Sequence, residues 1–260
     1  MIEKYDGFIF DLDGTIYRGE HLIPNADKTV NFIKSSGKET IFISNKTTGS
    51  VKDYFEFLHS KGLEINEDEI VNTTIVLKKY LSENFPGRRF FAIGEEIFIK
   101  EIESSGLAYS DVPEEIDLLL ITLDRTLNYQ KLETAAKALE NGARFFAANI
   151  DDTCPVDDGE VLDAGSTISA LEKRTHKKLE LHFGKPSVFM YEEIKCRLKV
   201  DLKNVLLVGD RLETDIALGN NFGIDTALVS TGVKLYPNGV NHIQPTYYFE
   251  SVFDLIKAKS

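Results

Sequence analysis

The sequence has few cysteines, fewer bases than acids and no long apolar run, and each shortage excludes a class of protein. The two cysteines, Cys154 and Cys196, lie in unrelated contexts without a Cys-x-x-Cys spacing. This usage argues against a disulfide-rich secreted scaffold and fits a reducing compartment. No run approaches the ~18 apolar residues that a membrane span needs, and the stretch before the first motif has no signal-like apolar segment. We therefore expect a soluble, cytoplasmic protein.

The charge balance narrows the expected partners. The chain has 42 acids against 30 bases, which gives a formal net charge of −12. A field of this sign repels the phosphates of nucleic acids and of anionic membranes, so we expect neither as a partner. A small phosphorylated molecule is compatible with this charge, provided that its binding site supplies local positive charge.

Short apolar runs alternate with longer amphipathic segments along the chain. This alternation is typical of βαβ units, in which helices cover both faces of a parallel sheet. The expected strands are residues 7–10, 40–44, 88–93, 117–122, 143–148, 204–209 and 225–230, and the expected helices are residues 30–36, 51–62, 74–84, 129–141 and 187–198. With 42% hydrophobic residues, the 260-residue chain can form one large α/β domain or two smaller ones.

Polar residues directly follow three of these runs. The first run ends in Asp11 and Asp13, the second in Ser44 and Asn45, and the run NVLLVG in Asp210. In α/β sheets, ligands bind beyond the carboxyl ends of the strands. If the three strands are neighbours, we expect these side chains to converge on one site.

The stretch DLDGT permits three interpretations. It could be an ordinary turn, because Asp and Gly are common turn residues. A calcium loop that starts at Asp11 is excluded, because its sixth and twelfth positions would be Ile16 and Leu22 instead of Gly and Glu. In the third interpretation, Asp11 and Asp13 point the same way and share a Mg²⁺ site with a phosphate ester. One acid can then act as a nucleophile through an aspartyl-phosphate, and the other as general acid and base.

Three further stretches carry groups suited to that chemistry. In GDRLETD, Asp210 follows a strand-like run, whereas Asp215 lies near the start of a helix and could equally be a capping acid. Lys185, in HFGKPS, precedes a helix and is a candidate for binding phosphate, although most lysines are solvated. Ser44 could cap the following helix or, with the backbone N–H groups at that junction, bind a phosphate.

Taken in order, DLDGT, a serine at a strand end, GKP and GD-x4-D resemble the motifs of the haloacid dehalogenase superfamily of Mg²⁺-dependent phosphohydrolases, over essentially the whole chain. The resemblance implies a Rossmann-like, doubly wound parallel sheet as the α/β core, with Asp11 as nucleophile and Asp13 as general acid and base. It implies that Mg²⁺ is held by Asp11, the backbone carbonyl of Asp13, and Asp210, with Asp215 in support. The implied phosphate-binding residues are Ser44, Asn45, Lys46 and Lys185. Lys46 departs from the usual second asparagine of this motif, and it could contact the phosphate or face solvent.

The motif spacing narrows the resemblance to one subfamily. The interval from Asp11 to Ser44 is too short for an inserted domain, whereas the interval from Ser44 to Lys185 is far longer than a core requires. This arrangement resembles the subfamily with an inserted α/β cap that includes 4-nitrophenylphosphatases, NagD-like proteins and sugar-phosphate phosphatases. We expect residues 1–81 and 181–260 to form the catalytic core and residues 82–180 to form the smaller cap domain. Caps of this kind often form dimer contacts, so a homodimer is compatible with the resemblance.

The resemblance implies a phosphatase of small phosphorylated metabolites. A phosphotransferase on the same fold and a catalytically silent phosphate-binding module are the alternatives, and the complete set of catalytic residues favours hydrolysis. Asp13 argues against a dehalogenase, which does not need that second acid. No residue pattern in the cap points to one substrate, and no role is assigned to the charged residues of its candidate loops, Asp124, Arg125, Asp151 and Asp163.

Overall fold

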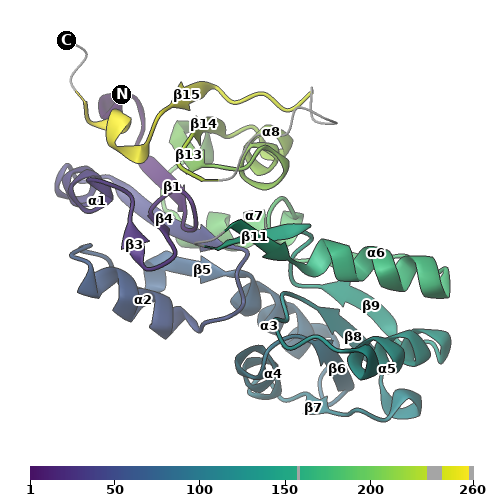
Figure 1. Cartoon of the computed structure of the whole chain (residues 1–260). Coiled ribbons are helices and arrows are strands. Elements are labelled where there is room, and N and C mark those ends of the chain that lie inside the picture. Colours follow the sequence, from purple (N-terminus) through teal and green to yellow (C-terminus); the bar gives the residue numbers. More distant parts are fainter. Residues whose placement is uncertain (157–158, 233–241, 258–260) are drawn as a thin grey trace.

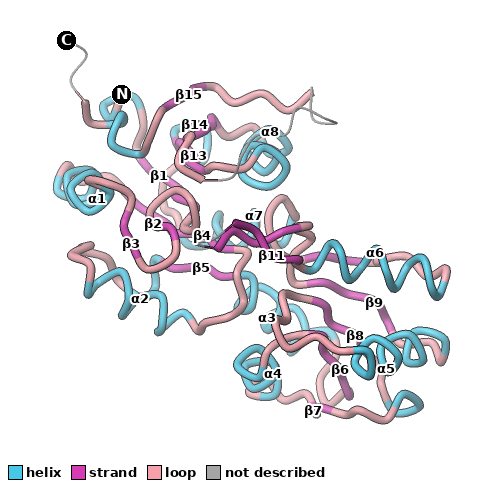
Figure 2. The backbone as a smooth tube through the Cα atoms, viewed as in Figure 1, coloured by secondary structure: helices cyan, strands magenta, loops and turns pink. Residues whose placement is uncertain are grey.

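The computed structural model describes residues 1–156, 159–232 and 242–257. Within these residues the chain forms two separate parallel β-sheets with helices packed against them (Figure 1). Figure 2 shows the strands as two groups, each with helices alongside. The α/β fold with a doubly wound parallel sheet and a smaller inserted α/β unit, expected from the sequence, is confirmed.

The first sheet has six parallel strands in the order β15-β14-β13-β1-β4-β5. Its strands are β1 (Gly7–Asp11), β4 (Glu39–Ser44), β5 (Ile70–Asn72), β13 (Val205–Gly209), β14 (Asp225–Val229) and β15 (Tyr247–Phe249). From β1 the chain proceeds outward on one side through β4 to β5, and it later returns to β13 on the other side. Such a reversal of strand order is where doubly wound sheets bind ligands.

Helices cover both faces of this sheet because alternate strand residues point to opposite faces. Phe8 and Phe10 belong to the apolar cluster that includes Val30 and Leu58 of the helices on one face. Ile9 belongs to the cluster on the other face. The covering helices are α1 (Ala26–Ser35), α2 (Val51–Ser60), α3 (Thr73–Asn84), α7 (Val188–Arg197) and α8 (Ala217–Phe222). Both β1 and β13 are therefore buried at every position.

The second sheet has five parallel strands in the order β12-β9-β8-β6-β7. Its strands are β6 (Arg89–Ile93), β7 (Ala108–Tyr109), β8 (Leu118–Ile121), β9 (Arg144–Ala147) and β12 (Leu181–His182), and its helices are α4 (Glu96–Glu103), α5 (Tyr129–Glu140) and α6 (Ala164–Thr175). Because β12 pairs with β9, residues 181 and 182 belong to this sheet and not to the portion that was expected to begin at residue 181. The division into two domains stays a prediction.

The two sheets share an apolar cluster. Ile9 of the first sheet, Leu77 of α3 and Phe90 of the second sheet belong to the same set of buried residues. Tyr80 of α3 also contacts the rings of Phe146 and Phe183. The sheets are therefore packed against each other through α3, in addition to being joined by the chain.

Two antiparallel hairpins complete the described structure. The hairpin of β2 (Tyr17–Arg18) and β3 (His21–Leu22) follows DLDGT, and the hairpin of β10 (Thr153–Val156) and β11 (Gly159–Leu162) follows β9. In Figure 1, β11 lies between the two sheets. None of the helices in the described ranges is long and apolar enough to cross a membrane.

Candidate active site

The carboxyl ends of three adjacent strands carry residues that the sequence singled out. β1 lies between β13 and β4 in the sheet, so the three strands are neighbours, which is the condition for these side chains to lie close together. β1 ends in Asp11, β4 ends in Ser44, and Asp210 directly follows β13. All three side chains are buried.

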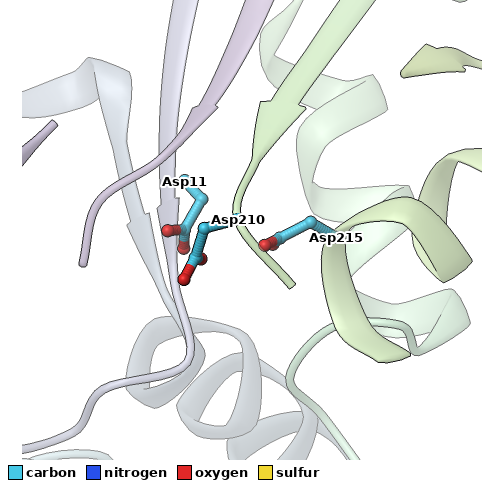
Figure 3. Close-up of side chains that lie close together, drawn as sticks. All are labelled: Asp11, Asp210 and Asp215. Atoms are coloured by element: carbon cyan, nitrogen blue, oxygen red, sulfur yellow. The ribbon is translucent and has the colours of Figure 1, made fainter. Parts of the chain in front are cut away.

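Three carboxylates come together at this edge of the sheet. Asp11, Asp210 and Asp215 each contribute an oxygen, and these oxygens lie within 4.8 Å of one another (Figure 3). Asp215 reaches the group from the helical turn between β13 and α8. Gly14 has a positive φ of 86°, a conformation that favours glycine. A Cβ at this position would lie 2.5 Å from Asp210 Oδ2, so the lack of a side chain lets the Asp210 carboxylate lie against the backbone of Gly14.

A buried ammonium group lies among these carboxylates. Lys185 Nζ donates to Asp11 Oδ1 and, at 2.7 Å, to Asp215 Oδ1, and its side chain is 3% exposed. Burial raises the pKa of Asp11; the Lys185 charge opposes this rise, and Asp215 and Asp210 add to it. Burial disfavours the charged form of Lys185, but the two carboxylates outweigh burial and raise the pKa of the lysine. Lys185 therefore stays charged and offsets part of the negative charge.

Asp13 lies in the same pocket with partners of its own. Its Oδ1 accepts a hydrogen bond from Lys46 Nζ at 3.0 Å, and its Oδ2 accepts one from the Tyr17 hydroxyl at 2.8 Å. Burial disfavours the charge of Lys46, but Asp13 outweighs burial and raises the pKa of this lysine. Lys46 thus faces Asp13. In the described part of the chain, the group of three close carboxylates contains Asp215 and not the side chain of Asp13.

The strand end of β4 is tied to two other parts of the pocket. Ser44 Oγ accepts a hydrogen bond from the Lys46 backbone N–H at 3.1 Å. Asn45 Oδ1 accepts one from the Lys185 backbone N–H at 2.7 Å, and Asn45 Nδ2 donates to Asp151 Oδ2 at 2.8 Å. The N-cap of α2 is Ser50, so Ser44 does not cap that helix.

All eight site residues predicted from the sequence line one pocket: Asp11, Asp13, Ser44, Asn45, Lys46, Lys185, Asp210 and Asp215. The hairpin β10–β11 covers this pocket through Thr153, Cys154 and Pro155. The space left between the side chains is about 50 Å³. By comparison, pockets that take drug-sized ligands have volumes of about 300–1,000 Å³.

Sequence reasoning left several lining residues unassigned. Arg211 lies between Asp210 and Asp215 in GDRLETD, a position that could have singled it out, and it pairs with Asp151. Asp163 was given no role, and burial, followed by the charge of Asp151, raises its pKa to about 6. The other lining residues that were not singled out are Thr153, Cys154, Pro155 and Thr214.

The donor set fits a hard divalent cation. Asp11 Oδ2 is buried and has no hydrogen-bond partner among the described residues. Leaving such an atom unpaired is unfavourable, and a cation bound there would remove the penalty. Carboxylate oxygens are the ligands that Mg²⁺ and Ca²⁺ prefer. Asp11, Asp210 and Asp215 therefore form a candidate metal site.

Two family models match the chain, one before and one after residues 109–181. A model described as haloacid dehalogenase-like hydrolase matches residues 8–108, and a model described as HAD-hydrolase-like matches residues 182–255. The sugar-phosphatase AraL of Bacillus subtilis is 32% identical over 252 residues, which cover 96% of this chain and 92% of that protein.

Solved structures are similar over almost the full length. The p-nitrophenyl phosphatase from Archaeoglobus fulgidus is 33% identical with a TM-score of 0.87, and the match covers 97% of this chain and 98% of that one. The glycerol phosphate phosphatase from Mycobacterium tuberculosis, solved in complex with magnesium, is 27% identical with a TM-score of 0.85, and the match covers 98% of this chain and 77% of that one. The chain therefore belongs to the haloacid dehalogenase-like hydrolases, in the group of the 4-nitrophenylphosphatases and NagD-like proteins.

Proposed function

We propose that this chain is a Mg²⁺-dependent phosphomonoesterase that hydrolyses small phosphorylated metabolites, such as sugar phosphates, through an aspartyl-phosphate on Asp11. The observation that carries the proposal is the state of the Asp11 carboxylate. One of its oxygens is held by the buried Lys185, and the other is buried with no donor among the described residues. The names of the similar proteins, which are phosphatases of sugar, nitrophenyl or glycerol phosphates, support the same reaction class.

In the first half-reaction, Asp11 is the nucleophile. Lys185, the Ser44 hydroxyl and Lys46, which line the pocket, would bind the phosphoryl oxygens of the substrate. An oxygen of the Asp11 carboxylate attacks the phosphorus, and the bond between phosphorus and the leaving oxygen breaks. Asp13, in its protonated form, donates its proton to that oxygen, and the alcohol is released.

In the second half-reaction, Asp13 acts as the base. Its carboxylate accepts a proton from a water molecule whose oxygen attacks the phosphorus of the aspartyl-phosphate. The bond between phosphorus and the Asp11 oxygen breaks, so inorganic phosphate is released and the Asp11 carboxylate is restored. The hydrogen bonds from Tyr17 and Lys46 fix the orientation of Asp13 for both proton transfers.

The proposed Mg²⁺ would be held by Asp11, Asp210 and Asp215, together with the backbone carbonyl of Asp13. When bound, it supplies positive charge that attracts the phosphate oxygens and offsets the charge that develops during transfer. With Lys185, this local charge explains how a chain of net charge −12 can bind an anionic substrate. Charges that are far from the pocket and exposed to solvent are screened, whereas buried ones are screened much less.

Substrate access requires the pocket to open. A space of about 50 Å³ is too small for a sugar phosphate while the hairpin β10–β11 lies over the site. Because the two sheets share an apolar cluster through α3, a displacement of the hairpin disturbs fewer buried contacts than a separation of the sheets. The residues of this hairpin would then contact the leaving group and take part in substrate choice.

The test is phosphate release from sugar phosphates, nucleotides, phosphoglycolate and 4-nitrophenyl phosphate, measured with Mg²⁺ and with EDTA. We expect Mg²⁺-dependent release from at least one class of phosphate monoester and no release in EDTA. Release that is equally fast in EDTA would contradict the metal dependence. Transfer to an added alcohol in preference to water would favour the phosphotransferase alternative, and binding without turnover of any substrate would favour the silent module.

A further inference from the structure

The segment that contains the hairpin β10–β11 is strongly acidic. Residues 150–163, with the sequence IDDTCPVDDGEVLD, include six acidic residues and no lysine, arginine or histidine. Two of these acids, Asp151 and Asp163, line the pocket together with Thr153, Cys154 and Pro155. This hairpin segment therefore brings negative charge and no positive charge to the pocket.

The cationic side chains that line the pocket are all paired. Among the described residues these are Lys46, Lys185 and Arg211, and each has a carboxylate oxygen within 3.2 Å of a nitrogen. In the proposed reaction, Lys46 and Lys185 bind the phosphoryl group. No described cation of the pocket is then left for a second anionic group of the substrate. Such a group would meet the acids of the hairpin segment and be repelled by them.

Asp163 differs from Asp151 in having one oxygen without a donor. It lies between β11 and α6 (Figure 1), and its side chain is buried. Its Oδ1 accepts hydrogen bonds from the Ala164 backbone N–H at 2.6 Å and from Asn149 Nδ2 at 3.1 Å. Its Oδ2 accepts none from the described residues, whereas both oxygens of Asp151 accept hydrogen bonds. Leaving a buried carboxylate oxygen unpaired is unfavourable, and a donor on the substrate would remove this penalty.

Asp163 is attached to the second sheet and not only to the hairpin. Asn149, its partner, directly follows the end of β9 by two residues and accepts a hydrogen bond from the Thr122 hydroxyl at 3.2 Å. The helix α6, which Asp163 caps, packs on the apolar cluster of that sheet through Ile168 and Leu171. Displacement of the hairpin therefore leaves Asp163 at the edge of the pocket, where an entering substrate would meet it.

The Cys154 thiol relates Asp163 to the residue that would protonate the leaving oxygen. Burial, followed by the charges of Asp163, Asp13 and Asp151, raises the pKa of Cys154, and the charge of Lys46 opposes this rise. Asp163 and Asp13 thus lie within electrostatic range of the same thiol. In the proposed reaction the leaving oxygen lies at Asp13, so the rest of the leaving alcohol extends toward the hairpin segment and Asp163.

We propose that Asp163 is a specificity-determining residue that accepts a hydrogen bond from a hydroxyl group of the leaving alcohol. The substrate class is then the phosphate monoesters of uncharged, hydroxylated alcohols, and alcohols with a carboxylate or a second phosphate are excluded by the acidic hairpin segment. The inference rests on the proposed function, since it takes the chain as a phosphatase. It deepens that function by naming the residue and the charge that select the leaving group.

The experiment compares kcat/KM within two pairs of substrates in which an uncharged end is replaced by a carboxylate. The pairs are glycerol 3-phosphate with 3-phosphoglycerate and glucose 6-phosphate with 6-phosphogluconate, each measured with the full chain in Mg²⁺ at pH 8. Burial and the charge of Asp151 raise the pKa of Asp163 to about 6, so its carboxylate is ionised at pH 8. A hydrogen bond to a charged group contributes about 10- to 150-fold to binding, so we expect the wild type to prefer the uncharged member of a pair by at least about 10-fold.

The variant Asp163→Asn removes the charge and keeps the size of the side chain. We expect the preference for the uncharged member to fall by about 10-fold, because the carboxylate substrate is repelled less and the hydroxyl group is bound less tightly. A merely structural role of Asp163 would lower kcat/KM for both members by the same factor and leave their ratio unchanged. The matched control is Asp124→Asn, which removes another buried carboxylate, one that pairs with Lys131 outside the pocket. Its ratio should equal that of the wild type.

The outcomes separate this inference from the proposed function. If the wild type releases phosphate from no monoester, including 4-nitrophenyl phosphate, the proposed function is wrong and this inference falls with it. If the wild type hydrolyses 4-nitrophenyl phosphate but none of the four compounds, or prefers the carboxylate members, only this inference is overturned. It is also overturned if Asp163→Asn keeps the wild-type ratio. Should Asp163→Asn fail to fold, Asp163→Ser decides in the same way, since serine is also a good N-cap residue for α6.

Discussion

Removing the ammonium group of Lys185 should destabilise the metal-free protein, and Mg²⁺ should reverse much of the loss. In Lys185→Met, the side-chain length is nearly kept, but Asp11 and Asp215 lose the charge that lies between them. The three side chains are 3%, 7% and 1% exposed for Lys185, Asp11 and Asp215. The small contribution typical of surface ion pairs therefore does not apply here.

The size of the effect follows from this burial. Breaking a buried ion pair by removing one partner costs about 3–5 kcal/mol. We take the lower end, about 3 kcal/mol, because Asp11 can relieve part of the cost by binding a proton. For a chain of this size, 1 kcal/mol corresponds to about 2–4 °C in melting temperature, so we expect a decrease of about 6 to 12 °C.

The decrease should depend on pH. Burial raises the pKa of Asp11 in the folded protein above its value of about 3.9 in the unfolded chain. A carboxyl group with a raised folded pKa favours folding at low pH, and this contribution is lost as the pH rises from the unfolded pKa through the folded one. Without Lys185 the folded pKa is higher still, so the difference from the wild type should be larger at pH 8 than at pH 5.

Thermal melts followed by circular dichroism, in EDTA and in saturating Mg²⁺, measure this effect. The control is Lys131→Met, which removes the partner of one buried carboxylate, Asp124, outside the pocket. It should lower the melting temperature by an amount that does not depend on Mg²⁺. Two results would refute the inference that Lys185 offsets the negative charge of Asp11 and Asp215. One is a Lys185→Met protein with the melting temperature of the wild type in EDTA at pH 8, and the other is a Lys185→Met protein whose melting temperature does not rise in Mg²⁺.

Three further predictions concern other groups of the pocket. Burial and the charge of Asp151 raise the folded pKa of Asp163 to about 6, so the wild type loses stability as the pH rises from about 3.9 through 6. Asp163→Asn should therefore be more stable than the wild type at pH 8, by about 2–3 kcal/mol, but not at pH 4. Equal stabilities of the two proteins at both pH values would contradict this. Asp13→Asn should slow hydrolysis of a sugar phosphate by about 10²- to 10⁴-fold and hydrolysis of 4-nitrophenyl phosphate far less. The reason is that the sugar is a poor leaving group and needs a proton, whereas 4-nitrophenolate does not. Equal losses for the two substrates would count against the acid role of Asp13. Burial raises the pKa of Cys154 to about 12, whereas Cys196 is exposed. Iodoacetamide at pH 8 should therefore modify Cys196 before Cys154, as followed by peptide mass spectrometry. The reverse order would show that the hairpin does not cover the pocket.

The strand-end residues of the site could be predicted from local sequence. Asp11, Ser44 and Asp210 each terminate or directly follow a continuous apolar run, and such runs form buried parallel strands whose ends meet at one edge. Lys185 and Asp215 could be placed only through the family resemblance, because a lysine in a loop and an acid in a helical turn have no distinctive local pattern. The strands β5 and β15 went unnoticed because each spans only three residues.

The contacts between the hairpin region and the strand ends could not be predicted in this way. Asp151 pairs with Arg211 and Asn45, which lie 60 and 106 residues away in the chain. Neither periodicity nor motif spacing relates residues at such separations, since their proximity results from the packing of the second sheet on the first. Lys46 contacts Asp13 across the ends of the neighbouring strands β1 and β4, and its contact with a phosphate stays a prediction.

The most direct test of the account is the rate of Mg²⁺-dependent phosphate release by Asp11→Asn relative to the wild type. The variant keeps the size of the side chain but removes the nucleophilic carboxylate, and mass spectrometry of the same sample excludes deamidation back to aspartate. We expect a folded protein with no turnover above background on any substrate that the wild type hydrolyses. Turnover by verified Asp11→Asn at the wild-type rate would contradict the assignment of Asp11 as the nucleophile.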